Sequence, residues 1–381
     1  MQTRFFISCQ IGLEDLLEQE LLEVFPWLLD LDFRPQTSGF EVVEKIKGGI
    51  EIETEFHFGL QLNYYLKVAS RILLRLSSTE RVQEFFQLEK ALKNLNLKKY
   101  LGAKAVSLQV DCSQSRLGQE KKVQATVEKS LNPIGVKFSS DASQKLFIRI
   151  HKDQLTVSLD TTGEHLHFRG YRKHQGIAPL RESLAAAALM LLRGTRSLGS
   201  LNDVELFDPF CGSGTFLFEA ATLFQPNFQR SFSFEGWDSL PVLLQKYPRK
   251  ERGLPGWPLQ LFLGGDRDPE MIDVAQRNAH PLFPQVKFTV GDFFGAQGAS
   301  QVRRQLWIVS NPPYHERLKA DFTMEEFVKK LQTLRPARLA LVLSEKQAAA
   351  FHRLWPGFPE LSTDNGGIAV KIIFSSEDLR W

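Results

Sequence analysis

Cysteine and long apolar runs are both scarce in this chain. Its 381 residues include 3 cysteines, Cys9, Cys112 and Cys211, which lie far apart and form no CxxC pair. This usage excludes a disulfide scaffold, argues against a structural zinc site and is typical of the reducing cytoplasm. No run of about 18 apolar residues is present, so we expect no membrane-spanning helix. The amino terminus lacks the basic-then-apolar order of a signal peptide, and we expect a cytoplasmic location.

Composition is that of a folded globular protein, but charge is distributed unevenly. Hydrophobic residues make up 43% and charged residues 24% of a chain long enough for two or three domains. Residues 1–60 hold 4 basic and 12 acidic side chains, whereas residues 61–174 hold 20 basic and 10 acidic ones. The rest is nearly neutral, with 23 basic and 22 acidic side chains. The basic segment is where a polyanion is expected to bind, although a solvated basic face beside an acidic one accounts for it equally well.

The amino-terminal half has the mixed pattern of an α+β region. Residues 1–60 predict a strand at Arg4–Ser8, a helix over Gly12–Val24 and a hairpin around Gly48 and Gly49. Leu60–Leu76 predicts a helix with Lys67, Arg71 and Arg75 along one face. Further on, the sequence predicts a helix over Lys121–Leu131 and strands at Ala105–Asp111, Leu146–Ile150 and Leu155–Leu159.

From residue 178 onward the pattern is that of an α/β domain. An Ala/Leu-rich helix is predicted up to Gly194, and it starts near Arg181 and Glu182, which either begin the helix or touch a ligand. Strands mostly separated by helices predict a largely parallel, doubly wound sheet. These strands are Val204–Phe207, Gln260–Leu263, Val286–Val290, Leu306–Val309, Leu339–Leu343 and Ala369–Phe374. Residues 226–258 are expected to form an irregular insertion, and the polar segment 163–177 a linker between domains.

A glycine-rich turn after the first of these strands predicts a cofactor site. The turn runs from Asp208 to Thr215, and Gly212 and Gly214 let its backbone approach a ligand closely. Asp266 ends the next strand and can bind ribose hydroxyls. Asp292 ends the one after and can accept from an adenine amine, with Phe293 against the ring. No lysine follows the glycines as in a phosphate-binding P-loop, so the pattern favours S-adenosylmethionine.

The alternative for Asp266 and Asp292 is that each only caps a helix. For the nearby Asp268, which a predicted helix follows at once, we favour the helix cap. Cys211 lacks a partner base and is interpreted as a packing residue. His165, His167 and His174 do not have metal-ligand spacing, and we expect no metal.

The segment Asn311-Pro312-Pro313-Tyr314 predicts the chemistry. It follows a strand, and its asparagine oxygen and the Pro312 carbonyl can accept hydrogen bonds from a nucleobase amine. Such contacts hold the amine in line with a sulfonium methyl group, while Tyr314 stacks on the base. The alternative is a rigid turn before a helix.

The order of motifs along nearly the whole chain resembles a known family. The segments that carry the resemblance are FFISCQIGLEDLLEQEL, NYYLKVASRILLRL, SRLGQEKKVQATVEKSL, APLRESLAAAALMLL, DPFCGSGTFLFEAA, FSFEGW, GGDRDPEMIDVAQRNA, SNPPYHERL and NGGIAVKIIF. They resemble the THUMP-domain-containing RNA guanine-N2 methyltransferases. One departure is His315, where members of the family commonly have glycine after the NPPY motif.

The resemblance implies an RNA-binding region followed by a Rossmann-like class I methyltransferase domain. The implied regions are a ferredoxin-like segment at 1–60, a THUMP domain with the end of that segment at 61–162, the linker at 163–177, and the methyltransferase at 178–381. The implied cofactor is S-adenosylmethionine, and the implied partner is structured RNA, either ribosomal or transfer RNA.

The residues that match the family motifs give the candidate site. The catalytic candidates are Asn311, Pro312, Pro313 and Tyr314. The candidates for cofactor binding are Asp208, Pro209, Phe210, Cys211, Gly212, Gly214, Thr215, Asp266, Arg267, Asp292, Phe293 and Asn311. For RNA contact the candidates, chosen from the basic segment, are Lys67, Arg71, Lys121, Lys122 and Arg172.

These observations favour methylation of a guanosine N2 amine, most readily in 23S ribosomal RNA, with transfer RNA as the alternative. The same NPPY chemistry can instead serve DNA adenine or protein glutamine. A non-catalytic RNA-binding or ribosome-assembly factor is a further alternative, which the intact glycines and NPPY motif disfavour.

Overall fold

The chain divides into two compact units, which are described separately. In a computed structural model, the amino-terminal unit comprises Met1–Cys9, Glu18–Leu166 and Arg230–Glu251, and the carboxyl-terminal unit comprises the remainder. The structure describes residues 2–29, 39–93, 95–102, 104–174, 180–196, 201, 204–223, 225–227, 229–238, 240, 244, 261–279, 283, 285–295, 305–313 and 322–380.

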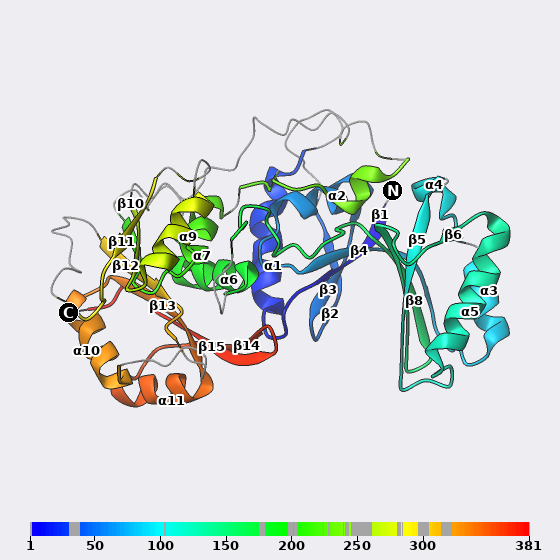
Figure 1. Ribbon diagram of the computed structural model, residues 1–381. Helices are drawn as coiled ribbons and strands as arrows, with labels where there is room; N and C mark the ends of the chain where they lie inside the picture. The colour runs from blue at the N-terminus through cyan, green and yellow to red at the C-terminus, as the bar shows by residue number, and fades with distance from the viewer. Residues whose placement is uncertain are drawn as a thin grey trace. The chain divides into compact units, whose positions relative to one another are not determined.

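The amino-terminal unit is built on one eight-stranded sheet with the order β2-β3-β1-β4-β8-β7-β5-β6 (Figure 1). Neighbouring strands are antiparallel, except that β5 runs parallel to both β6 and β7. Its strands are β1 (Gln2–Ser8), β2 (Glu41–Ile46), β3 (Gly49–Glu55), β4 (Arg71–Thr79), β5 (Ala105–Ser113), β6 (Lys137–Phe138), β7 (Gln144–His151) and β8 (Gln154–Asp160). The α-helices are α2 (Phe56–Tyr65), α3 (Phe85–Lys93), α4 (Lys98–Leu101) and α5 (Glu120–Leu131), and two short 3-10 helices cover Phe25–Trp27 and Asn132–Ile134. Helix α1 (Glu14–Val24) is divided between the two units at Leu17 and Glu18.

The predicted helix over Leu60–Leu76 is wrong beyond Tyr65. The carboxylate of Glu20, which is fully buried, accepts hydrogen bonds from the backbone amides of Lys67 (2.5 Å) and Val68 (3.0 Å). These amides therefore cannot bond to carbonyls one turn earlier, and the helix ends. The chain instead enters β4, a strand between β1 and β8 whose place in the sheet overrides the local helical pattern.

This correction also changes the environment of two basic residues. Lys67 is 2% exposed and Arg71 is 8% exposed. The Arg71 guanidinium forms an ion pair with the buried carboxylate of Asp160 and donates to the Gly163 carbonyl at 2.6 Å. Burial raises the pKa of Asp160, and the charge of Arg71 opposes that rise. Arg71 therefore holds β4 to the end of β8 within the sheet.

Part of the predicted insertion packs within the amino-terminal unit. The short helix Ser233–Gly236 is followed by Trp237, whose indole N–H donates to the Gln144 side chain at 2.8 Å. The Tyr64 hydroxyl donates to Glu235 at 2.8 Å. Residues 233–237 are thus part of the amino-terminal unit, although the rest of that unit ends at Leu166.

The carboxyl-terminal unit has a seven-stranded sheet with the order β11-β10-β9-β12-β13-β15-β14. The first five strands in this order are parallel, and β15 is antiparallel to both of its neighbours, β13 and β14, as predicted for a largely parallel sheet. The strands are β9 (Val204–Asp208), β10 (Leu261–Asp266), β11 (Val286–Val290), β12 (Gln305–Ser310), β13 (Arg338–Ser344), β14 (Glu360–Asn365) and β15 (Ile368–Phe374). The helices are α6 (Glu182–Arg193), α7 (Thr215–Thr222), α9 (Pro269–Ala279), α10 (Met324–Leu334) and α11 (Glu345–Leu354).

The end of the predicted linker packs against α7. Arg169 is 3% exposed and donates two hydrogen bonds to the fully buried carboxylate of Glu219, at 3.3 and 3.1 Å. The Tyr171 hydroxyl donates to the same carboxylate at 2.7 Å. Burial acts to lower the pKa of Arg169, but the Glu219 carboxylate outweighs it and the pKa is raised. Residues 169–171 are therefore held by a buried ion pair in the carboxyl-terminal unit.

The burial of Arg71 predicts that this residue is structural. Replacing Arg71 with Met leaves the Asp160 carboxyl buried and unpaired, which we expect to lower the free energy of unfolding by about 3–5 kcal/mol. Denaturant unfolding followed by circular dichroism measures the change. The exposed Lys121→Met variant is the control and should lose less than about 0.5 kcal/mol. Equal stability of the two variants would contradict the structural role.

Candidate active site

The predicted site residues lie at the carboxyl ends of adjacent parallel strands. Strand β9 pairs with β10 on one side, with Gly264 opposite Asp208, and with β12 on the other, with Ile308 opposite Phe207. This register brings the turn after β9, Asp266 at the end of β10 and Asn311 just beyond β12 to one edge of the sheet. In doubly wound sheets this edge is where ligands bind, beside the strand at which the order reverses.

The glycine-rich turn is fixed to β10 by backbone contacts. The Gly212 amide donates to the Asp266 carboxylate at 3.0 Å, and the Cys211 amide donates to the Gly265 carbonyl at 2.9 Å. Gly212 and Gly214 have φ values of +48° and +90°, a region that favours glycine. A Cβ atom at Gly212 would meet no described residue within 4 Å, so this part of the structure leaves open space above the turn.

Two buried groups in this turn are kept from ionising easily. Asp208 is 2% exposed, and burial raises the pKa of its carboxyl well above the usual range. The Phe210 amide, which donates to Asp208 at 3.2 Å, opposes that rise, and the neighbouring charge of Asp266 adds to it. Burial, followed by the charges of Asp208 and Asp266, likewise raises the pKa of the Cys211 thiol. A thiol held neutral in this way fits the interpretation of Cys211 as a packing residue.

The acids that follow differ in their surroundings. Asp266 is half-buried, and its two oxygens each accept one backbone hydrogen bond, from Gly212 and from Asp268, which leaves lone pairs for a ligand. Asp292 is exposed, and one of its oxygens accepts from the Phe294 amide at 3.1 Å. Asp268 accepts from the Glu270 amide at the start of α9, which confirms the helix-cap prediction for this residue.

Among the remaining cofactor candidates, the aromatic rings are turned inward. Phe293 is 5% exposed and packs against Phe210 and Phe327 at centroid distances of 5.5 and 5.7 Å. Its ring belongs to the apolar cluster beneath the sheet edge, where α10 also packs. Arg267 is exposed. Stacking of Phe293 on an adenine stays a prediction.

Asn311 carries the most informative atom of the site. Its side-chain oxygen is shielded from solvent and accepts no hydrogen bond from any residue that the structure describes. A buried amide oxygen without a donor costs about 1–3 kcal/mol, so a ligand that donates there binds with that advantage. Pro312 is buried beside it, while Tyr314 and His315 lie outside the described residues. The atom therefore matches the acceptor predicted for an amine.

Arg172, a candidate for RNA contact, lies at the glycine-rich turn instead. Its side chain is 9% exposed, forms an ion pair with Glu182 at 3.4 Å and donates to the Thr215 hydroxyl and the Leu180 carbonyl. Burial raises the pKa of Glu182, and the charge of Arg172 opposes that rise. The prediction that Arg172 faces RNA is therefore corrected: it supports the first residue of α7. Sequence reasoning missed this role because Arg172 and Thr215 are distant along the chain.

The other candidates for RNA contact separate by exposure. Lys121 and Lys122 are exposed at the start of α5. Lys67 and Arg71 are buried, so these two do not present their charges to a polyanion, contrary to the prediction.

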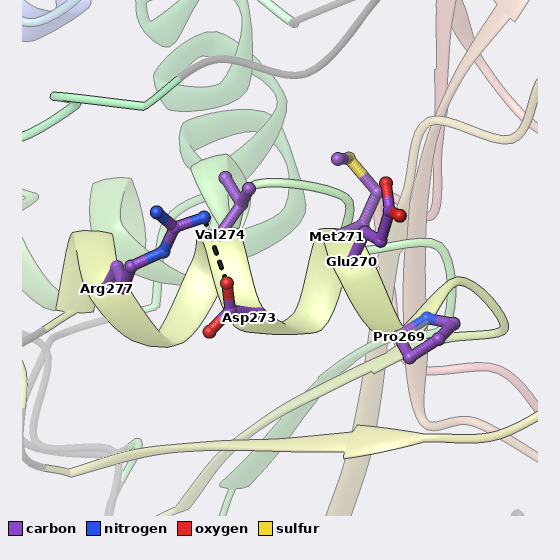
Figure 2. A pocket seen from close by; sticks show the side chains of 6 residues that line it. All are labelled: Pro269, Glu270, Met271, Asp273, Val274 and Arg277. Atoms are coloured by element: carbon purple, nitrogen blue, oxygen red, sulfur yellow. Dashed lines mark ion pairs between the residues drawn. The ribbon is translucent and has the colours of Figure 1, made fainter.

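A hollow of about 420 Å³ lies along α9 (Figure 2). Met271 and Val274 line it together with Asp273 and Arg277, which form an ion pair at 2.9 Å along the helix. None of its lining residues belongs to the candidate site.

The described ranges contain neither a candidate metal cluster nor a candidate membrane-spanning helix. Three or more histidine, cysteine or acidic side chains do not gather there in a way that could hold a metal ion. Likewise, no helix in those ranges has the length and apolar character needed to cross a membrane.

The two glycines of the turn should respond differently to alanine. At Gly214 a Cβ atom would lie 2.7 Å from the Phe218 ring at a φ of +90°, so Gly214→Ala should lower the free energy of unfolding by about 2–4 kcal/mol. Gly212→Ala meets only the backbone penalty of about 1–2 kcal/mol. Chemical denaturation measures both values. A Gly212→Ala variant less stable than Gly214→Ala would contradict this geometry.

Comparison with known proteins relates this unit to methyltransferase domains. Residues 169–350 match the family model described as "RMKL-like, methyltransferase domain". The "Ribosomal RNA large subunit methyltransferase K/L" of Ectopseudomonas mendocina is 29% identical over 400 residues, covering 96% of this chain and 52% of that protein. The chain thus spans about half the length of the curated relatives it matches.

Solved structures extend the similarity to the whole chain. "A possible methylase from Clostridium difficile 630" is 26% identical with a TM-score of 0.77, and the match covers 100% of both chains. The structure of "SMU.472, a putative methyltransferase complexed with SAH" is 22% identical with a TM-score of 0.79, covering 100% of this chain and 99% of that one. The Rossmann-like sheet is that of a class I methyltransferase. Residues 169–350 therefore form a domain that is similar to the RMKL-like methyltransferase domains.

Proposed function

We propose that the protein is an S-adenosylmethionine-dependent RNA methyltransferase that acts in the cytoplasm on the exocyclic N2 amine of a guanosine, in large-subunit ribosomal RNA. The observation that carries the proposal is the shielded Asn311 oxygen, which accepts from no described residue and lies at the strand edge that also bears the glycine-rich turn. The name of the Ectopseudomonas relative supports ribosomal RNA as the substrate.

The residues around the turn fit the cofactor. Open space above Gly212 admits a ligand against the backbone, and the remaining lone pairs of Asp266 can accept from ribose hydroxyls. Asp208 is buried and forms no ion pair within the described part of the chain, so a cationic ligand nearby would stabilise its charged form. When bound, S-adenosylmethionine supplies a methyl group on a positively charged sulfur. The SAH bound to SMU.472 supports the same ligand class.

Two acceptors of this chain orient the target amine. The Asn311 side-chain oxygen and the Pro312 carbonyl accept the two N–H groups, which directs the nitrogen lone pair toward the methyl group. The two prolines restrict the backbone of this turn, so little conformational freedom is lost when the base binds. In a site shielded from water these hydrogen bonds also stabilise the partial charge that develops on the amine.

The RNA-binding surface that we propose lies on α3 and α5, which pack against each other (Figure 1). Exposed lysines follow both helices and form what we call the basic face: Lys90, Lys93, Lys121, Lys122 and Lys129. Phe86 is 66% exposed on the same side of α3 as Lys90 and Lys93 and can stack on an unpaired base. This face replaces the buried candidates Lys67, Arg71 and Arg172.

Methyl transfer from labelled cofactor tests the proposal. The purified chain is incubated with ribosomal RNA, transfer RNA, DNA and protein from cells that lack its gene, and the labelled products are digested and identified. We expect N2-methylguanosine in the large-subunit ribosomal RNA. Label in transfer RNA alone would favour the transfer RNA alternative, and label only in DNA or protein would overturn the RNA assignment.

Removing the Asn311 amide should stop the chemistry without affecting the cofactor. We expect Asn311→Ala to lower kcat by about 10²–10³-fold, because the amine loses an acceptor in the transition state. The Kd for S-adenosylmethionine, measured by calorimetry, should stay within twofold of the wild-type value. Asn311→Asp keeps an acceptor oxygen and should retain more activity than the alanine variant. Wild-type turnover by Asn311→Ala would refute the role.

Neutralising the start of α5 should weaken RNA binding through its ionic part. For Lys121→Ala combined with Lys122→Ala, we expect the slope of log K against log salt concentration to fall in magnitude by about 1–2. Filter binding over a range of salt concentrations measures it. Lys287→Ala combined with Lys329→Ala removes two exposed charges from the carboxyl-terminal unit and is the matched control. An unchanged slope in the first variant would place the RNA elsewhere.

A further inference from the structure

Helix α11 begins with a capping box whose glutamine has a second partner. Ser344 is the first residue of the box, and the Gln347 side-chain oxygen accepts from its amide (3.2 Å) and its hydroxyl (3.1 Å). The Gln347 side-chain nitrogen donates to the Pro313 carbonyl at 3.0 Å. One amide group thus satisfies the helix start with its oxygen and contacts the Asn311–Pro313 turn with its nitrogen.

The position of α11 explains why this contact forms. Ser344 ends β13, the parallel neighbour of β12, with Leu341 opposite Ser310. The chain leaves both strands at the same edge of the sheet, β12 into the Asn311–Pro313 turn and β13 into α11. The first turn of α11 is therefore adjacent to the residues that we propose hold the target amine.

A second capping box in the same unit provides a comparison. At the start of α10, the Glu326 carboxylate accepts from the amide and the hydroxyl of Thr323, at 2.7 and 2.9 Å. Both oxygens of a carboxylate are acceptors, so glutamate can complete such a box but cannot donate to a carbonyl. Only a glutamine at the α11 position can serve both partners.

We propose that Gln347 is a positioning residue for methyl transfer, an inference that rests on the proposed function. By fixing the Pro313 carbonyl it holds the peptide two residues after Asn311, and the restricted proline backbone transmits this constraint to the Asn311 oxygen and the Pro312 carbonyl. Because Ser344 donates to the Gln347 side-chain oxygen, the side-chain nitrogen of Gln347 is held in the rotamer that donates to the Pro313 carbonyl. Gln347 itself does not contact the substrate.

Gln347→Glu separates the two roles of this side chain. The glutamate retains the capping box but loses the donor and sets a carboxylate oxygen against the Pro313 carbonyl. We expect kcat to fall by about tenfold, with the Kd for S-adenosylmethionine and the KM for RNA within twofold of wild type. The capping box persists, since glutamate is as suitable as glutamine there, and the thermal midpoint should fall by no more than about 2–4 °C, the effect of one lost hydrogen bond. Glu326→Gln in α10 is the matched control and should leave kcat unchanged.

Ser344→Ala gives the opposite separation. It removes the hydroxyl of the cap and should lower the thermal midpoint. The backbone amide of residue 344 still donates to the Gln347 oxygen, so the bond between Gln347 and Pro313 remains and kcat falls less than in Gln347→Glu. A kcat loss with Ser344→Ala as large as with Gln347→Glu would reduce Gln347 to a helix cap. Wild-type kcat in Gln347→Glu would overturn the positioning role while the proposed function stands. Absence of transfer by the wild-type protein to any RNA would overturn the proposed function first, and this inference with it.

Discussion

The candidate site depends on the parallel pairing of β9 with β10 on one side and β12 on the other. Because all three strands end at one edge, the glycine-rich turn, the Asp266 carboxylate and the Asn311 amide oxygen meet there without being close in sequence. Two hydrogen bonds then fix the turn to its neighbouring strand: the Gly212 amide donates to the Asp266 carboxylate, and the Cys211 amide donates to the Gly265 carbonyl. The pairing of the strands thus places the three turns that carry the candidate site residues.

Polar groups buried next to this edge divide into satisfied and unsatisfied ones. Arg169, Tyr171 and Glu219 satisfy one another beneath α7, and Arg172 bonds to Thr215 at its start. Such complete networks hold an element in one place. The Asn311 oxygen is different, since it is shielded and accepts from no described donor. An acceptor that is left open beside satisfied networks is the arrangement expected of a preorganised site.

Local patterns predicted six of the seven strands of the carboxyl-terminal unit, because each of these six is rich in apolar residues. They missed β14 (Glu360–Asn365), whose sequence ELSTDN is mostly polar. They failed for Leu66–Leu76, where Glu20 ends the helix from a distant position. They also failed for Lys67 and Arg71, whose charges suggested exposure while burial depends on tertiary contacts. The contact of Gln347 with Pro313 joins residues 34 positions apart and leaves no sequence signal beyond a helix cap. The boundaries predicted for the ferredoxin-like and THUMP regions stay predictions.

The most direct measurement is a crystal structure of the chain with S-adenosylhomocysteine and a guanosine-containing RNA fragment. We expect the guanine N2 atom to lie within hydrogen-bond distance, about 2.7–3.2 Å, of the Asn311 side-chain oxygen. We also expect the ribose of the cofactor product to contact Asp266. A guanine bound away from Asn311, or a cofactor product bound away from the turn after β9, would contradict the proposed site.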